Sequence, residues 1–202
     1  MKVELIEYTP NGINKIARLA RSTRKNKLEE YEEWYKDNEK FVKQLISVKH
    51  YGILEHITFT FHVSEISRCL THQLVRHRMA SYLQMSNRHA KPNEDDYVTP
   101  HTLKTDKAKK CYEWIIETSW AYYNELINEG VPIEDARYVL PPAFFTHITI
   151  TMNCRELRHF FELRCEKYAQ WEIRELATEM LKICYDKYPI IFEDLYKRYT
   201  DG

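Results

Sequence analysis

The 202-residue sequence predicts a mixed α+β fold that is dominated by helices. Short segments at residues 2–8, 55–63 and 144–152 alternate apolar and polar residues, which is typical of half-buried strands. Longer segments repeat apolar residues every three to four positions, as amphipathic helices do. The composition, 44% hydrophobic and 30% charged, and the length favour one globular domain over residues 1–202.

The chain is expected to begin with a strand and two helices. The charged, alternating stretch KVELIEY predicts a strand at residues 2–8. A helix rich in Arg and Lys should follow at 13–25. A second helix is expected at 28–49, because that segment is acidic first and basic last, which suits the helix dipole.

The next strand and helix precede a segment with unusual charge. In the strand at 55–63 the apolar residues from Ile57 to Val63 occupy every second position and therefore share one face. Ser64 is expected to cap a helix that runs from Glu65 to about His77. A polar loop to about Pro92 should follow.

Helices also dominate the C-terminal half. A long helix is expected at 103–129, closed by Gly130, and a shorter one from Pro132 to the Pro141-Pro142 pair. After the strand at 144–152, Asn153 should cap a helix, with Glu156 completing a capping box. A last helix should begin near residue 170 and end at Tyr188-Pro189.

Positive charge is concentrated in one segment. No Asp or Glu occurs between Glu65 and Glu94, so residues 66–93 carry +5 and the rest of the neutral chain carries −5. The five cations are Arg68, Arg76, Arg78, Arg88 and Lys91. Arginine suits planar recognition of phosphate and carboxylate, so the segment predicts an anion site.

Two further arginines fall on apolar helix faces. Arg164 continues the stripe of Leu157, Phe160 and Phe161, and Arg137 shares a face with its apolar neighbours in PIEDARYVL. Each guanidinium either reaches water or a nearby Glu, or points into a cleft that binds an anion. In a cleft, arginine could stabilise charge that develops during a reaction, by roughly 3 kcal/mol or about 10²-fold in rate.

Several kinds of site are excluded. Four glycines, none suitably spaced, allow neither G-x-G-x-x-G nor a Walker A loop. Five cysteines without a C-x-x-C pair argue against a disulfide framework and a zinc ribbon. His56 and His62 would lie about 20 Å apart at ~3.3 Å per residue, so no metal site is expected. No carboxylate near Ser86 orients a base, so Ser86 is expected to bind phosphate rather than to act as a nucleophile.

Partners and location follow from charge and hydropathy. The basic loop at 76–91 allows an alternative function as a nucleic-acid-binding module, but the zero net charge lacks the usual broad basic footprint and favours small anions. A third interpretation pairs this loop with an acidic patch at 29–39 of a neighbouring copy. No apolar run has the length of a signal peptide or membrane span, so a cytoplasmic protein without membrane contact is expected.

The basic segment resembles a family signature. Arg76-His77-Arg78, then seven residues, then Ser86 and Arg88 reproduce the R-H-R-x7-S-x-R pattern of the flavin-dependent thymidylate synthases. EHITFTFHV, ARYVLP, N-C-R-x-L and L-R followed by A-Q-W-E-I-R are similar to that family in the same order. The resemblance covers roughly residues 45–195 and is weaker before them, where it rests on Ala20-Arg21-Ser22.

The resemblance implies a helix-rich α+β protomer with a small, mostly antiparallel sheet, assembled as a homotetramer whose subunits share active sites. It implies FAD as cofactor, reduced by NADPH, and methylenetetrahydrofolate as the carbon donor that converts dUMP to dTMP. No cysteine nucleophile is required for this reaction.

The same resemblance implies the binding residues. FAD would contact Arg76, His77, Arg78, Gln84, Asn153, Arg155 and His159, with His50 and Gly52 near it from another subunit. The substrate dUMP would contact Gln73, Arg76, Gln84, Ser86, Arg88, Arg137 and Arg164. Arg164 would be catalytic, stabilising the uracil as its N3 proton is lost. Departures from residues frequent in the family at Leu83, His89 and Tyr168 bear on ligand affinity rather than on the reaction class.

Overall fold

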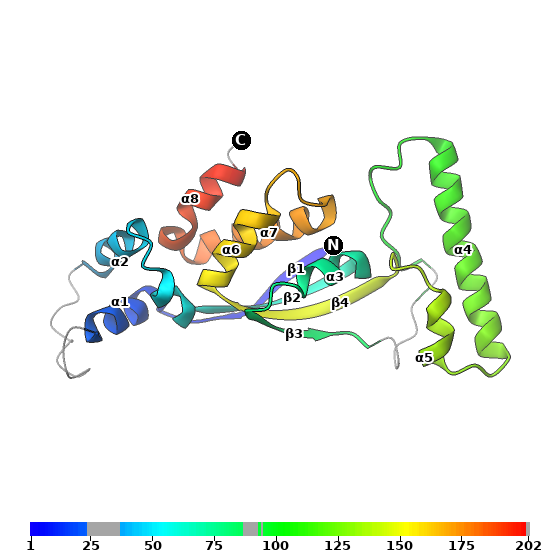
Figure 1. The fold of residues 1–202 in the computed structure, drawn as a ribbon, viewed down its shortest axis with the longest axis horizontal. Coiled ribbons are helices and arrows are strands. Elements are labelled where there is room, and N and C mark those ends of the chain that lie inside the picture. The colour runs from blue at the N-terminus through cyan, green and yellow to red at the C-terminus, as the bar shows by residue number, and fades with distance from the viewer. Residues whose placement is uncertain (24–36, 87–92, 94, 201–202) are drawn as a thin grey trace. The chain divides into compact units, whose positions relative to one another are not determined.

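The computed structural model describes residues 1–23, 37–86, 93 and 95–200 (Figure 1). In chain order the elements are β1 (Lys2–Tyr8), α1 (Gly12–Ser22), α2 (Asn38–Ser47), the 3-10 helix η2 (Tyr51–His56), β2 (Thr58–Ser67), α3 (Arg68–Leu74), β3 (Ala80–Gln84), α4 (Asp106–Asn128), α5 (Ile133–Ala136), the 3-10 helix η3 (Arg137–Val139), β4 (Phe145–Asn153), α6 (Cys154–Arg164), α7 (Trp171–Lys187) and α8 (Pro189–Thr200).

The strands form one four-stranded sheet in the order β1-β2-β4-β3. Strands β1 and β2 are antiparallel, because Thr9 N–H donates to the carbonyl of Thr58 at 3.0 Å while Lys2 pairs with Glu65 at the opposite ends. A small antiparallel sheet among many helices confirms the predicted α+β class.

The chain divides into two compact units. The first comprises Met1–Lys2, Val63–Arg76 and Leu83–Thr149, and the second comprises Val3–His62, His77–Tyr82 and Ile150–Gly202. All four strands contribute residues to both units. The prediction of a single domain stays a prediction.

The second unit contains an aromatic core between its strands and helices. Phe59 and Phe61 point inward from β2 as the alternation predicts, and both are fully buried. The Phe192 ring of α8 contacts Phe59 at 6.3 Å and Phe161 of α6 at 5.8 Å between centroids. Helices α6, α7 and α8 therefore form a layer against the strands (Figure 1).

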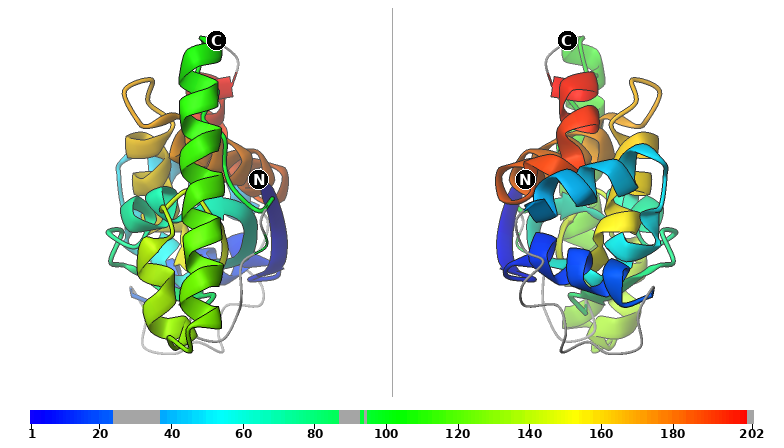
Figure 2. Two further views of the ribbon diagram at one scale, coloured as in Figure 1. Left: turned by 90° about the vertical axis from the view of Figure 1, so that its right-hand side faces the viewer. Right: turned by 90° about the vertical axis from the view of Figure 1, so that its left-hand side faces the viewer.

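The first unit is built around the long helix α4, with α5 beside it (Figure 2, left). Trp120 stacks between Tyr123 of the same helix and Phe144, at 5.4 and 5.9 Å between ring centroids. Gly130, with φ of 84°, ends the helix as predicted, because the left-handed region favours glycine. The outer side of α4 leaves Trp114 and Tyr122 exposed.

The predicted helix at 65–77 is wrong in its start. Strand β2 continues to Ser67, and Ser67 rather than Ser64 is the cap of α3, accepting from Leu70 N–H at 3.1 Å. Glu65 has φ of 57°, and burial shifts by one residue there, from Val63 to Ile66, as in a β-bulge. Neighbouring strands, which no local pattern reveals, keep this segment extended.

Three elements were missed. The 3-10 helix η2 occupies 51–56, so Glu55 and His56 of the predicted strand at 55–63 lie outside β2, which begins at Thr58. Residues 80–84, predicted as loop, form β3, because this polar segment pairs with β4. Pro189 was interpreted as a stop signal, but it also begins α8, since proline at a first helical position loses no hydrogen bond. Of the helix predicted at 28–49, the structure shows α2 from Asn38 to Ser47. Residues 28–36 of that prediction, and residues 24–25 of the helix predicted at 13–25, lie outside the described residues.

Candidate active site

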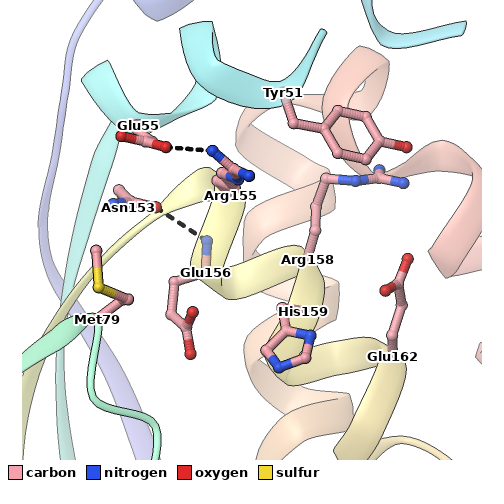
Figure 3. A pocket seen from close by; sticks show the side chains of 9 residues that line it. All are labelled: Tyr51, Glu55, Met79, Asn153, Arg155, Glu156, Arg158, His159 and Glu162. Carbon is pink, nitrogen blue, oxygen red and sulfur yellow. Dashed lines mark hydrogen bonds and ion pairs between the residues drawn. The ribbon is translucent and has the colours of Figure 1, made fainter. Parts of the chain in front are cut away.

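The second unit contains a cavity of about 520 Å³ along one side of α6 (Figure 3). It is lined by Tyr51, Glu55, Met79, Asn153, Arg155, Glu156, Arg158, His159 and Glu162. The side chain of Asn153 accepts from Glu156 N–H at 2.9 Å, which confirms the predicted cap and sets where α6 begins. Residues 155, 158, 159 and 162 then fall on one helical face.

The two arginines of this face are held differently. Arg155 is exposed and pairs with Glu55 of η2 at 2.5 Å. Arg158 is 3% exposed and donates to both carboxylate oxygens of Asp194, at 2.8 and 2.5 Å, and to the carbonyl of Ile191. Its guanidinium lies 5.1 Å from the centre of the Tyr51 ring. Burial alone would lower the pKa of Arg158, but the bond to Asp194 raises it, so Arg158 is a charged structural group.

A buried histidine lies beside the same helix. His77 is 6% exposed, and its Nδ1 is 3.2 Å from Oε1 of Glu156. On the other side of the ring, Nε of Arg164 donates to Nε2 of His77 at 3.0 Å. The hydroxyl of Tyr82 donates to the His77 carbonyl at 2.8 Å, and the Phe160 ring meets the imidazole edge to face at 5.0 Å.

Burial and neighbouring charge determine how this cluster ionises. Burial, followed by the charges of Arg164 and His159, lowers the pKa of His77 to about 4, so the ring is neutral at pH 7. Burial raises the pKa of Glu156, and His159 opposes that change. Burial and then the charge of Glu156 raise the pKa of Tyr82, which keeps its hydroxyl protonated and able to donate.

The structure brings three of the predicted flavin residues, Asn153, Arg155 and His159, into this one cavity. His50 and Gly52 are exposed on either side of the cavity residue Tyr51. Exposed Arg78 precedes Met79, another cavity residue, and His77 is buried as described above.

Other predicted residues lie in the first unit. Gln84 donates to the hydroxyls of Thr71 and Thr146, at 3.0 and 3.3 Å. Gln73 bonds to a carbonyl of α3, while Arg76 and Ser86 are exposed. Arg88 lies outside the described residues.

Two guanidinium groups interact in the first unit. Arg137 donates from Nε to the carbonyl of Glu134 at 2.8 Å and is half-buried. Burial and then the charge of Arg137 lower the pKa of Arg68. Arg68 also donates to the carbonyl of Met85 at 3.2 Å, next to Ser86. This pair is electropositive, and an anion would relieve the repulsion within it.

Glu156 is the main residue that sequence reasoning missed. It was predicted only to complete the capping box, yet its carboxylate faces His77. No local signal identifies such a contact. The orientation of Arg164 was better predicted, because its half-buried position and bond to His77 agree with the inward helix face.

The cysteines, the potential metal ligands and the helices each bear on whether the described residues hold a reactive thiol, a metal site or a membrane span. All five cysteines are free, and burial raises the pKa of Cys165 to about 12 and those of Cys154 and Cys184 well above the ordinary value. Among the described residues, no three His, Cys, Asp or Glu side chains are grouped to hold a metal ion. No helix in the described part of the chain combines the length and apolar character needed to cross a membrane.

Comparison with known proteins identifies the family. The family model described as thymidylate synthase complementing protein matches residues 4–190. The chain therefore belongs to this family, the flavin-dependent thymidylate synthases, as the R-H-R-x7-S-x-R pattern indicated.

Relatives match over most of their length. The flavin-dependent thymidylate synthase of Geobacter sulfurreducens is 42% identical over 200 residues, covering 96% of this chain and 86% of the relative. That of Sulfurisphaera tokodaii is 41% identical over 197 residues, covering 95% and 76%. That of Pyrococcus furiosus is 47% identical over 153 residues, covering 72% and 62%.

Proposed function

We propose that this chain catalyses the reductive methylation of dUMP to dTMP, with methylenetetrahydrofolate as carbon donor and FAD, reduced by NADPH, as cofactor. The cavity on α6 carries the proposal, because it gathers Asn153, Arg155 and His159 in a chain of this family. Family membership also favours the enzyme over a nucleic-acid-binding module.

The cavity suits a flavin in size and chemistry. Its volume of about 520 Å³ falls within the usual range of ligand pockets, ~300–1,000 Å³. Tyr51 and Met79 offer aromatic and apolar surface, and Asn153, Arg155 and His159 offer polar groups for a ring edge and phosphates. A reduced flavin held by these residues would supply the hydride. The further contacts that we propose are His50, Gly52, Arg76, His77, Arg78 and Gln84.

We assign the nucleotide to residues that recognise a phosphate and a uracil. The proposed contacts are Gln73, Arg76, Gln84, Ser86, Arg88, Arg137 and Arg164. The repulsion between Arg68 and Arg137 supports a phosphate there, since an anion would relieve it. Arg164 would stabilise the uracil anion formed when the N3 proton leaves, an electrostatic effect of roughly 3 kcal/mol.

The proposed assembly is a homotetramer that shares active sites between subunits. Exposed aromatic side chains on α4, including Trp114 and Tyr122, support burial of this helix against another copy. Size-exclusion chromatography with light scattering should give four times the 24.5 kDa chain mass. A monomer at working concentration would contradict the assembly.

The cofactor gives the most direct test. Protein purified without additives should be yellow, and a colourless protein that takes up no FAD would overturn the proposal. Bleaching of the flavin by NADPH or NADH, with and without dUMP, identifies the reductant, and dTMP formation identifies the reaction. Steeply salt-dependent oligonucleotide binding without dTMP formation would instead support the nucleic-acid-binding alternative.

A further inference from the structure

A chain of hydrogen bonds runs from Glu156 through His77 to Arg164. Oε1 of Glu156 lies 3.2 Å from Nδ1 of His77, and Nε of Arg164 lies 3.0 Å from Nε2 of the same ring. Glu156 and Arg164 are two turns apart on α6, and His77 bridges them from the segment before β3. All three side chains are buried or half-buried.

The protonation of arginine fixes which atoms donate and which accept in these two hydrogen bonds. The guanidinium of arginine keeps its protons at physiological pH, so Nε of Arg164 can only donate and Nε2 of His77 must accept. A neutral imidazole has one donor and one acceptor, so its proton must be on Nδ1. Nδ1–H then requires an acceptor, which the carboxyl oxygen Oε1 of Glu156 provides.

The surroundings keep the imidazole neutral. A second proton on Nε2 would place two donors face to face and bring a cation against Arg164. His159 of α6, whose ring centre is 6.2 Å from that of His77, also lowers the pKa of His77 through its charge. Tyr82 from β3 contacts the His77 carbonyl rather than the ring, and Phe160 supplies an apolar wall.

We propose that Glu156 and His77 are positioning residues that together orient the guanidinium of Arg164. The carboxylate selects the Nδ1–H tautomer of His77, and Nε2 of that tautomer holds Nε–H of Arg164. Because the guanidinium is planar, anchoring Nε sets the directions of the Nη donors as well. The inference deepens the proposed function, on which it rests, by explaining how Arg164 is directed at a uracil anion.

A purely structural role for Glu156 makes a different prediction. In the predicted capping box, the Glu156 side chain would accept from the backbone N–H of Asn153, and Gln would serve equally well. The bond from Glu156 N–H to the Asn153 side chain, at 2.9 Å, needs no particular side chain at 156. In the positioning role Gln is a poor substitute, because an amide can donate to Nδ1 and thereby permit the Nε2–H tautomer. That tautomer cannot accept from Arg164.

The tautomer can be observed without measuring turnover. In a ¹⁵N NMR spectrum of the full protein labelled at histidine, the His77 signals, identified by their loss in His77→Gln, should show protonated Nδ1 and bare Nε2 at pH 7. Glu156→Gln should shift them towards a mixture of tautomers. A wild-type ring protonated at Nε2 would overturn the proposal. This spectrum needs no stable Glu156 variant.

Kinetic measurements test whether the hydrogen bonds from Glu156 through His77 orient Arg164 for the reaction. Glu156→Gln should lower kcat for dTMP formation by about 10- to 100-fold with a smaller change in KM for dUMP, since misorientation weakens stabilisation of charge that develops in the reaction. Glu156→Asp, which keeps a carboxylate, should recover part of the rate. Glu179→Gln on α7, whose carboxylate pairs with Lys182 at the surface, controls for loss of a charge and should match the wild type.

A double-mutant cycle separates this role from a general loss of structure. In an Arg164→Ala background, Glu156→Gln should cause no further loss of kcat, because the group that it orients is gone. Unchanged kcat in Glu156→Gln, or an equal loss in the Arg164→Ala background, would overturn the inference. Absence of dTMP formation by the wild type would instead overturn the proposed function. The histidine spectrum would still decide whether the hydrogen bond from Glu156 selects the Nδ1–H tautomer of His77.

Discussion

The neutral, buried His77 makes the stability of the protein depend on pH in a defined window. Burial, with Arg164 and His159, lowers its pKa from 6.5 to about 4 in the folded protein. Between these values the unfolded chain binds a proton at this residue and the folded protein does not. The free energy of unfolding therefore falls as the pH drops from 6.5 to about 4, and this histidine contributes no further change below that.

The size of the effect follows from the two pKa values. The difference between 6.5 and about 4 corresponds to roughly 3 kcal/mol, at about 1.4 kcal/mol for each pH unit. For a chain of this length, ~3 kcal/mol moves the melting temperature by about 6–12 °C. Replacing His77 with Gln removes the titrating group and keeps a polar side chain of similar reach.

The assay compares unfolding of the wild type and His77→Gln in urea and by heating, at pH values from 7 to 4. Carboxylates elsewhere titrate in both proteins, so the difference between the two isolates His77. The wild type should lose roughly 3 kcal/mol more than the variant across the window. The exposed His56→Gln substitution controls for removal of a histidine. Parallel curves for wild type and His77→Gln would refute a buried neutral imidazole.

Three further substitutions test the site and the fold. Arg164→Ala should keep its flavin and fold but form dTMP about 10²-fold more slowly, and normal turnover would remove Arg164 from the mechanism. Asp194→Asn weakens the forked contact to buried Arg158; because the Asp194 side chain is 61% exposed, we expect a loss of about 2 kcal/mol and a melting temperature lower by about 4–8 °C. Burial raises the pKa of Asp194, but the hydrogen bond and charge of Arg158, together with two backbone hydrogen bonds, lower it overall, so that loss should shrink in acid; a melting temperature of Asp194→Asn equal to that of the wild type at pH 7 would contradict this prediction. Gly12→Ala would place a Cβ 2.7 Å from the Tyr188 hydroxyl, which accepts from Gly12 N–H at 2.8 Å. We expect this crowding to lower the free energy of unfolding by about 1–3 kcal/mol. An unchanged urea midpoint would show that the contact relaxes without cost.

Helix α6 carries both structural contacts and residues of the proposed site on one short segment. Its Asn153 cap sets the start of the helix, Arg158 ties it to α8, and Arg155 presents a cation at the cavity. Glu156, which also lines the cavity, and Arg164 both contact His77. The positions of these groups are coupled because one rigid helix carries them all, which is how a site gains fixed geometry at little entropic cost.

Local sequence patterns determined several features correctly. The burial of Phe59 and Phe61, the Asn153 cap and the inward position of Arg164 all follow from periods of two or 3.6 residues and from capping chemistry. Such signals depend on neighbours within one or two turns, so they can be read along the chain. The family signature came from the spacing of residues 76–88 in the same way.

Other features depended on the tertiary structure. The continuation of β2 to Ser67 and the strand β3 require partner strands to accept and donate their backbone hydrogen bonds, which no local pattern supplies. His77 contacts Glu156 and Arg164, which lie 79 and 87 positions further along the sequence. Only folding brings such groups within hydrogen-bond distance. The sequence thus determined which residue types are present and which helix face they occupy. The fold decided which of them meet, because hydrogen bonding and desolvation act over a few ångströms of space whatever the separation along the chain.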